Sequence, residues 1–160
     1  MVDQRTSELV VTAPSDREII MTREFEAPRD LVWRAFTEPA LLAQWWGRGN
    51  KLDIERMEVE PGGHWRYVEH HEGGSDGFVG RYREVTPPER IVQTFEWDGM
   101  PEHVIVNTTA FEDLPGGRTR LTTHSLFLTP EDRDGMLSSG MEGGLNESYD
   151  ALDRLLATIV

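Results

Sequence analysis

The sequence contains no cysteine, and Lys51 is its only lysine among 160 residues. Without cysteine the chain has no disulfides, no thiolate metal ligands, no thiol nucleophile and no thiol redox chemistry. Positive charge is scarce as well, because 16 basic side chains stand against 29 acidic ones and give a formal net charge of −13. Such a chain repels phosphate backbones and anionic lipid surfaces, so we expect neither nucleic acid nor membrane as a partner.

Long apolar runs are also missing. No stretch approaches the roughly 18 apolar residues that a membrane-spanning helix needs, and residues 1–16 lack the apolar segment of a secretory signal. We therefore expect a cytoplasmic protein. Its length is that of one ordinary domain, which is large enough to bury a core without disulfides or a structural metal.

Motifs for cofactors and metals are likewise absent. Gly47-Arg48-Gly49 lacks the third glycine and the preceding strand of a dinucleotide-binding turn. No phosphate-binding loop and no nucleophile elbow occurs. His70 and His71 are adjacent, so on a strand they point to opposite faces and cannot share a metal. We expect no cofactor and no metal site.

The patterning that is present predicts an α+β domain over residues 17–160, preceded by a flexible N-terminal tail over residues 1–16. β-branched and aromatic residues predict a first strand at 18–26. Pro28 and Pro39 then favour two short helices between the first and second strands. Turn-rich clusters of glycine and proline separate six further predicted strands, at 52–60, 63–71, 76–86, 89–97, 103–113 and 118–128.

A long helix is predicted after Thr129, an N-cap residue followed by proline at the first helical position. Apolar residues recur at helical spacing from Met141 to Ile159, so a continuous helix would cover residues 130–159. One helix can cover a seven-stranded antiparallel sheet if the sheet curves around it. Glycines crowd the first half of this helix, which predicts a gap between helix and sheet and hence a small ligand.

Strand alternation assigns candidate ligand-binding residues to the inner face of the sheet. The predicted binding set also includes residues from the short helices and the long helix; it comprises Trp45, Trp65, Tyr67, Phe78, Tyr82, Gln93, Phe95, Trp97, Asn107, Met136 and Met141. Ordinary core packing is the alternative interpretation for any single aromatic among them.

Three residues are candidates for acid–base chemistry: Tyr82, Glu84 and His124. Alternation from Tyr82 places Glu84 on the inner face, where burial would raise the pKa of its carboxyl. The alternative is that Glu84 pairs with an arginine or lies at an open rim. His124 is on the last predicted strand, and its alternative role is an ordinary hydrogen-bonded strand histidine.

The order of elements and a set of motifs over residues 17–159 resemble the START-like superfamily, which has the helix-grip fold of the birch-pollen allergen. Within it, the chain is similar to stand-alone bacterial homologues of the C-terminal domain of the activator of the heat-shock chaperone ATPase. The motifs are Phe25-Glu26-Ala27-Pro28, Val32-Trp33-Arg34-Ala35-Phe36-Thr37, Pro39-Ala40-Leu41-Leu42-Ala43-Gln44-Trp45-Trp46-Gly47, Pro61-Gly62-Gly63-His64-Trp65-Arg66-Tyr67, Gly80-Arg81-Tyr82-Arg83-Glu84-Val85 and Gly117-Arg118-Thr119-Arg120-Leu121-Thr122.

The resemblance implies a curved seven-stranded antiparallel sheet wrapped around the long C-terminal helix. It implies no single activity, because this fold hosts carriers, receptors and cyclases. Three hypotheses follow: a binding module for a small hydrophobic or aromatic molecule, a cyclase, dehydratase or hydrolase, and a chaperone ATPase co-regulator. The eukaryotic activators carry a further N-terminal domain for chaperone binding. Here only the predicted tail of residues 1–16 stands in that place, so we do not expect this chain to stimulate a chaperone ATPase. A homodimer is expected if Trp45 or Trp46 is exposed.

Overall fold

The computed structural model describes residues 8–159. Eight strands form one antiparallel sheet in the order β1-β2-β8-β7-β6-β5-β4-β3. The strands are β1 (Val10–Thr12), β2 (Glu18–Phe25), β3 (Lys51–Met57), β4 (His64–His71), β5 (Gly74–Thr86), β6 (Arg90–Trp97), β7 (Ile105–Leu114) and β8 (Arg118–Leu126). The helices are α1 (Arg29–Thr37), α2 (Pro39–Leu42), α3 (Pro130–Ser138) and α4 (Met141–Ile159).

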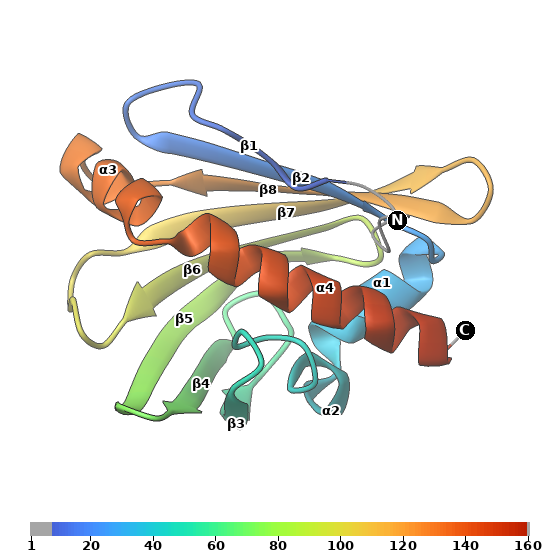
Figure 1. Cartoon of the computed structure of the whole chain (residues 1–160), viewed down its shortest axis with the longest axis horizontal. Coiled ribbons are helices and arrows are strands. Elements are labelled where there is room, and N and C mark those ends of the chain that lie inside the picture. The colour runs from blue at the N-terminus through green and yellow to red at the C-terminus, as the bar shows by residue number, and fades with distance from the viewer. Residues whose placement is uncertain (1–7, 160) are drawn as a thin grey trace.

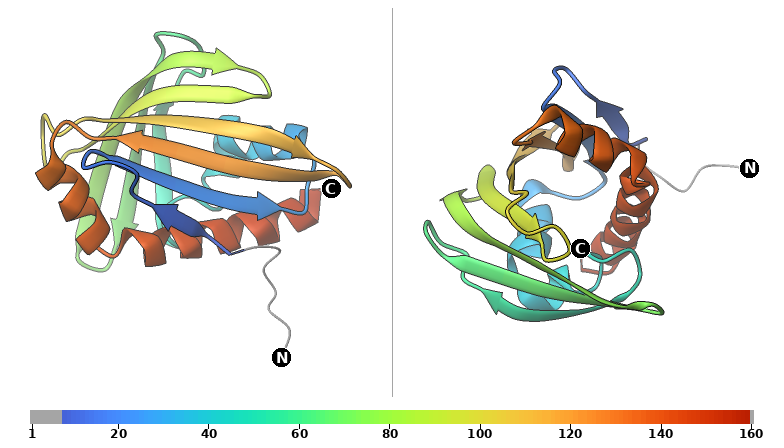
Figure 2. Two further views of the ribbon diagram at one scale, coloured as in Figure 1. Left: turned by 90° about the horizontal axis from the view of Figure 1, so that it is seen from above. Right: turned by 90° about the vertical axis from the view of Figure 1, so that its left-hand side faces the viewer.

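The predicted helix-grip architecture is confirmed. Two short helices follow β2, and the sheet curls so that α4 crosses its concave side (Figure 1). Viewed from the end that carries α3, the strands, α1, α2 and α4 surround a common interior (Figure 2). The concave side of the sheet therefore faces the helices α1, α2 and α4 (Figure 2).

The sheet has one strand more than the seven predicted. The extra strand is β1, which pairs antiparallel with β2, with Val10 opposite Thr22. It falls inside the segment that we expected to be a tail, and residues 1–7 of that segment lie outside the described residues. A strand of three residues is too short for alternation to reveal it; its pairing with the longer β2 forms it.

The C-terminal helix is broken into two helices where the sequence predicts one. Gly140 adopts a φ of 82°, a left-handed conformation that ends α3 and lets α4 begin at Met141. Thr129 caps α3 as predicted, its hydroxyl accepting a hydrogen bond from the Asp132 amide at 3.1 Å. The break lets α3 leave the line of α4 at one end of the molecule (Figure 1).

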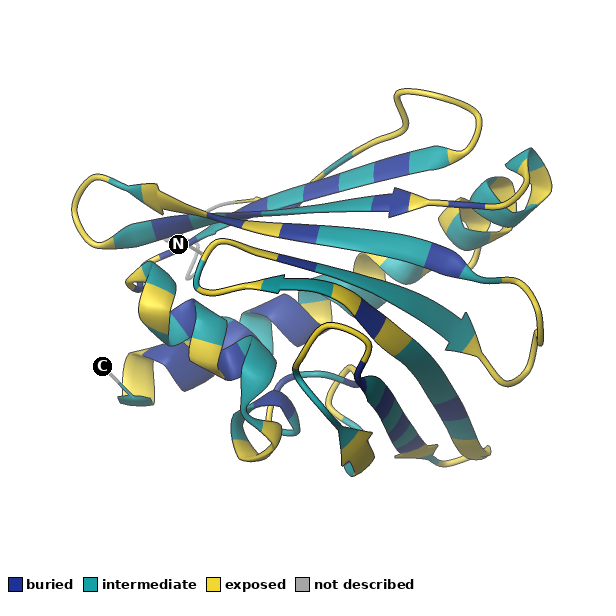
Figure 3. Cartoon of the chain, turned by 180° about the vertical axis from the view of Figure 1, so that it is seen from behind, coloured by how far each residue is buried: buried dark blue, intermediate teal, exposed yellow. Residues whose placement is uncertain are grey.

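The core is concentrated beneath the second half of α4. The buried residues of α4 begin only at Ser148 and continue through Tyr149, Leu152, Leu155 and Leu156. They face the buried side of β2 and α1, where residues alternate between buried and partly exposed (Figure 3). α3 contributes no buried residue. The helical segment is thus anchored at its C-terminal half and only loosely packed at its N-terminal half.

A buried arginine fixes α4 to the sheet. Arg23 on β2 is 1% exposed, and its guanidinium pairs with Asp150 at 3.1 Å and with Asp153, both on α4. The guanidinium also lies 5.1 Å from the centre of the Phe25 ring. Removing one partner of such a buried pair leaves an uncompensated charge, so this contact specifies where α4 sits on the sheet.

None of the helices within residues 8–159 is long and apolar enough to cross a membrane.

Candidate functional site

An aromatic cluster covers the concave face of β4, β5 and β6. Trp65 and Tyr67 on β4 lie with their ring centres 4.6 Å apart, and Phe78 on β5 lies 5.4 Å from Phe95 on β6. Trp46, in the segment after α2, packs edge-on against both Tyr67 and Phe78, at 5.3 and 5.1 Å. Four of the predicted ligand-binding residues are therefore brought together by neighbouring strands.

Gly80 creates the space in which Trp65 lies. A side chain at Gly80 would begin 1.9 Å from the Thr94 carbonyl oxygen and 2.5 Å from the Trp65 indole nitrogen. That indole nitrogen donates a hydrogen bond to the Thr94 carbonyl at 3.2 Å. The indole thus satisfies its one donor against the backbone of β6 while its ring faces the interior.

A β-bulge removes Glu84 from the interior. Tyr82 pairs with Gln93, but Glu84 pairs with Val92, so one extra residue of β5 is inserted between them. Because side chains alternate along a strand, one extra residue turns Glu84 to the outer face. There it is partly exposed and lies 3.3 Å from Arg90. The predicted inner position of Glu84 is wrong, and its alternative as an arginine partner is confirmed.

His124 also faces away from the interior. Its neighbours Thr123 and Ser125 share the concave side with the buried residues of β8, and His124 has the opposite parity. On the outer face its Nε2 pairs with the carboxylate of Glu18 on the neighbouring strand β2, and this hydrogen bond lowers the pKa of Glu18. His124 is therefore a strand histidine in a surface pair and does not reach the concave face.

Tyr82 is the one acid–base candidate that does lie inside. It is 2% exposed, and burial raises the pKa of its hydroxyl, with a hydrogen bond to Tyr67 acting in the opposite direction. Burial also raises the pKa of Tyr67, and the Tyr82 hydroxyl adds to that effect. Both phenols stay protonated at neutral pH, so neither is a general base there.

The neighbouring strands present polar side chains to the same interior. Gln93 on β6 lies opposite Asn107 on β7, which lies opposite Ser125 on β8. The Ser125 hydroxyl donates to the Asn107 side-chain oxygen at 2.6 Å. Thr109 and Thr123 form the next cross-strand pair, with their hydroxyls 3.4 Å apart. The concave face thus carries a group of polar side chains on β6 to β8 beside the aromatic cluster and the apolar core residues of the same strands.

The remaining predicted residues lie at the edges of this interior. Trp45 is a core residue: it is 3% exposed, it packs against Phe36 and Tyr149, and its indole donates to the Ala35 carbonyl at 2.9 Å. Trp45 therefore does not meet the condition on which we expect a homodimer, and Trp46 is only partly exposed.

At the opposite end, toward α3, the predicted residues are more open. Trp97 is 38% exposed, and its indole donates to Asp76 at 3.0 Å. Met136 on α3 and Met141 on α4 are half-buried and pack against the core. Methionine side chains at such an opening adapt readily to what they contact.

A buried carboxylate near the aromatic cluster escaped the sequence analysis. Glu69 on β4 is 2% exposed, and its Oε2 accepts hydrogen bonds from Arg48 at 2.6 Å and from Asn50 at 2.7 Å. The Arg48 amide in turn donates to Ser148 on α4 at 3.1 Å. Glu69 has the same parity on β4 as Trp65 and Tyr67, so strand alternation indicates that its side chain points inward. Its partners Arg48 and Asn50 lie in the loop between α2 and β3, and no sequence pattern predicts how that loop folds.

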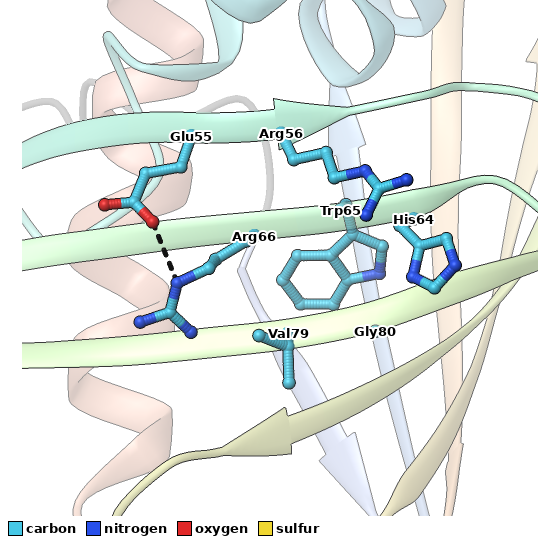
Figure 4. Close-up of a pocket in the computed structure, with 7 residues that line it drawn as sticks. All are labelled: Glu55, Arg56, His64, Trp65, Arg66, Val79 and Gly80. Carbon is cyan, nitrogen blue, oxygen red and sulfur yellow. Dashed lines mark hydrogen bonds and ion pairs between the residues drawn. The ribbon is translucent and has the colours of Figure 1, made fainter.

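Hollows on the outer side of β3 to β6 are lined mainly by outward-facing residues, although Trp65 and Gly80 border one and Tyr82 borders another. The first, of about 310 Å³, is a shallow depression over the outer surfaces of β3, β4 and β5 (Figure 4). Arg66 crosses it to reach Glu55 at 2.9 Å. The second adjoins Gly62 and Thr94. Within residues 8–159, no group of three or more histidine, aspartate or glutamate side chains is arranged to hold a metal ion.

Residues 26–157 match the family described as activator of Hsp90 ATPase homolog 1-like protein. The chain belongs to this family. The match begins after β2 and spans α1, the strands β3 to β8 and most of α4, so it includes every residue of the predicted binding set. No curated protein matches the chain.

Solved structures show the same fold. A protein from Rhodobacter sphaeroides is 30% identical, has a TM-score of 0.87 and aligns over 96% of this chain and 100% of its own. A protein from Staphylococcus epidermidis is 25% identical with a TM-score of 0.80, aligning over 92% of this chain and 94% of its own. A protein from Arthrobacter aurescens, 24% identical over 93% of this chain and 91% of its own, has a TM-score of 0.84 and supports the fold alone.

Proposed function

We propose that this family member binds a small hydrophobic or aromatic molecule between the concave face of the sheet and the first half of α4. The observation that carries the proposal is the uneven packing of the helical segment. α3 has no buried residue, and α4 has none before Ser148. Phe78 on β5 and Phe95 on β6, both in the aromatic cluster, remain partly exposed.

Aromatic surface of this kind favours a ligand for a simple reason. Each buried aromatic side chain gains free energy by leaving water, at about 25 cal/mol per Å² of apolar surface. Phe78 and Phe95 realise only part of that gain, because both side chains are only partly buried. An apolar molecule placed against them would complete their burial. The half-buried Met136 and Met141 lie where they can adjust to its shape.

The test is titration with N-phenyl-1-naphthylamine, an uncharged aromatic probe that fluoresces in apolar surroundings. We expect saturable binding, quenching of tryptophan fluorescence and a rise in the unfolding temperature with probe concentration. Phe78→Ala should weaken binding, because Phe78 faces the interior between Trp46 and Phe95. Val79→Ala, one residue along on the outer face, is the matched control. Failure of the probe to saturate, or equal affinity in both variants, would refute the proposal.

Catalysis has less support than binding. Of the three acid–base candidates, Glu84 and His124 occupy the outer face, and only Tyr82 lies inside. A protonated phenol with a raised pKa can donate a hydrogen bond but does not abstract a proton at neutral pH.

The family's description makes stimulation of a chaperone ATPase a second candidate function. It rests on the match of residues 26–157. The deciding measurement is the ATPase rate of a purified Hsp90-type chaperone with increasing amounts of this chain. A saturable rise in the ATPase rate would support this function. An unchanged rate would refute it and leave ligand binding as the one proposed function.

A further inference from the structure

A row of uncharged polar side chains crosses the concave face in register. Tyr82 on β5 lies opposite Gln93 on β6, which lies opposite Asn107 on β7, which lies opposite Ser125 on β8. Residues directly opposite one another in antiparallel strands have Cβ atoms about 4.5–5.5 Å apart. The four side chains therefore form a continuous polar row, with Phe95 and Ile105 in the row on one side of it.

Much of the hydrogen-bonding capacity of this row is unused. The Gln93 side chain makes no hydrogen bond with any residue of the described chain. Asn107 accepts one from Ser125 through its oxygen, which leaves its two amide hydrogens free. Gln93 and Asn107 are partly exposed, so a ligand can reach them.

The helix on the other side of the interior also presents an unsatisfied group. The Asn146 side-chain oxygen on α4 is buried, and no donor in the described chain bonds to it. Asn146 precedes Tyr149 and Asp153 by three and seven residues, so all three share the side of α4 that reaches β8 and β2. A buried acceptor without a donor is costly, and a donor brought by a ligand would remove that cost.

The charged side chains at the borders of this face already have partners. Arg23 pairs with two aspartates of α4, Glu69 pairs with Arg48, and Asp76 bonds to both His71 and Trp97. The row itself carries no charge. A carboxylate or ammonium on a ligand placed against it would lose water and gain no ion partner there, which is expensive.

We propose that this row selects an uncharged aromatic ligand that carries a hydroxyl or similar hydrogen-bonding substituent, and discriminates against ionised ligands of the same shape. This inference rests on the proposed function, because it assigns the ligand class of the same interior. The aromatic cluster holds the ring system, and Gln93 and Asn107 bond to its substituents. Fatty acids and aromatic acids are the ligand classes it disfavours.

Three matched probes test the inference: naphthalene, 2-naphthol and 2-naphthoate, each measured by displacement of N-phenyl-1-naphthylamine at neutral pH. Naphthalene supplies the ring alone, 2-naphthol adds an uncharged donor and acceptor, and 2-naphthoate adds a negative charge. We expect 2-naphthol to bind about tenfold more tightly than naphthalene, the gain of one or two neutral hydrogen bonds. 2-Naphthoate should bind most weakly of the three.

Two nearly isosteric variants locate the effect. Gln93→Leu and Asn107→Leu should each reduce the preference for 2-naphthol over naphthalene, and the double variant should abolish it. Their affinity for naphthalene should stay the same or rise, which also shows that they fold. Thr108→Val, beside Asn107 but on the outer face, should leave all three affinities unchanged.

The outcomes separate this inference from the proposal on which it depends. If no probe binds, the proposed function itself fails. If all three bind with equal affinity, or if the preference for 2-naphthol survives in the double variant, binding stands and the selective role of the row is refuted. Tighter binding of 2-naphthoate than of 2-naphthol would refute the uncharged ligand class.

Discussion

At the residue scale, Gly80 holds the aromatic cluster in place by having no side chain. The Trp65 indole occupies the space above it and bonds to the Thr94 carbonyl. Even one methyl group there would press on a backbone oxygen, which cannot move without disturbing β6. The position of the whole cluster on the concave face thus depends on a residue that contributes no contact of its own.

We predict that Gly80→Ala destabilises the protein by about 1–3 kcal/mol, the usual cost of overpacking a filled interior. It should also shift the tryptophan emission of the folded state, because Trp65 must move. Gly135→Ala is the matched control: Gly135 lies in α3 with nothing within 4 Å of the added methyl group. That change should stabilise by up to about 1 kcal/mol through helix propensity. Urea denaturation of both variants measures the difference, and equal effects would contradict this account.

Glu84 shows where residue-level prediction fails. Alternation places the concave residues of β4 correctly, because Trp65, Tyr67 and Glu69 are all buried. On β5 the same rule holds through Tyr82 and then inverts at the bulge. A bulge depends on how a strand pairs with its neighbour, and the sequence of one strand does not contain that information. The row from Tyr82 to Ser125 is predictable only in part for the same reason. Alternation within each strand indicates which side chains point inward, but the register between the four strands decides which of them lie opposite one another.

At the element scale, the break at Gly140 separates α3, which has no buried residue, from α4, which packs on the sheet from Ser148 onward. Apolar spacing predicts α4 well, and the glycine content correctly indicates loose contact with the sheet. It does not indicate which glycine ends a helix, because glycine is compatible with both helical and left-handed backbone. Gly140 takes the left-handed conformation, whereas Gly135 and Gly143 remain helical.

We predict opposite effects from alanine at two neighbouring glycines. Gly140→Ala forces a side chain into a φ of 82° and should cost about 1–2 kcal/mol. Gly143→Ala adds a methyl group to a helical position with nothing within 4 Å and should stabilise by up to about 1 kcal/mol. Thermal or urea unfolding of the two variants provides the comparison. If Gly140→Ala stabilises the protein instead, residues 130–159 can form one continuous helix.

At the scale of the whole molecule, the net charge of −13 is spread over a surface of many local ion pairs. On the outer face, Arg118 and Arg120 both bond to Glu24 across β2 and β8. On the inner face, the Arg23 pair fixes α4 to the sheet. The fold class and the family were predictable from the order of elements. The inner pair was not, because it joins residues about 130 positions apart in the sequence.

These two sites make opposite contributions to stability as pH changes. For Glu24, burial raises the pKa, but hydrogen bonds from Arg120 and Arg118 prevail and the folded pKa is lowered from 4.5. Its stabilisation is therefore present above pH 4.5 and lost as pH falls through the lowered folded value. For Asp153, burial prevails over Arg23 and raises the folded pKa from 3.8. Its contribution is present below pH 3.8 and lost as pH rises through the raised folded value.

We predict that Glu24→Gln and Asp153→Asn change the slope of stability against pH in opposite directions. Between roughly pH 3 and 6, Glu24→Gln should lose less stability than the natural chain on acidification. Asp153→Asn should lack the decline that the Asp153 carboxyl causes on raising pH, whatever constant cost it carries from the weakened Arg23 pair. Urea denaturation at several pH values measures both slopes. If the stability curves of Asp153→Asn and of the natural chain are parallel, Arg23 fully compensates the burial of Asp153. The ion pair between Arg23 and Asp153 then carries no cost in stability at neutral pH.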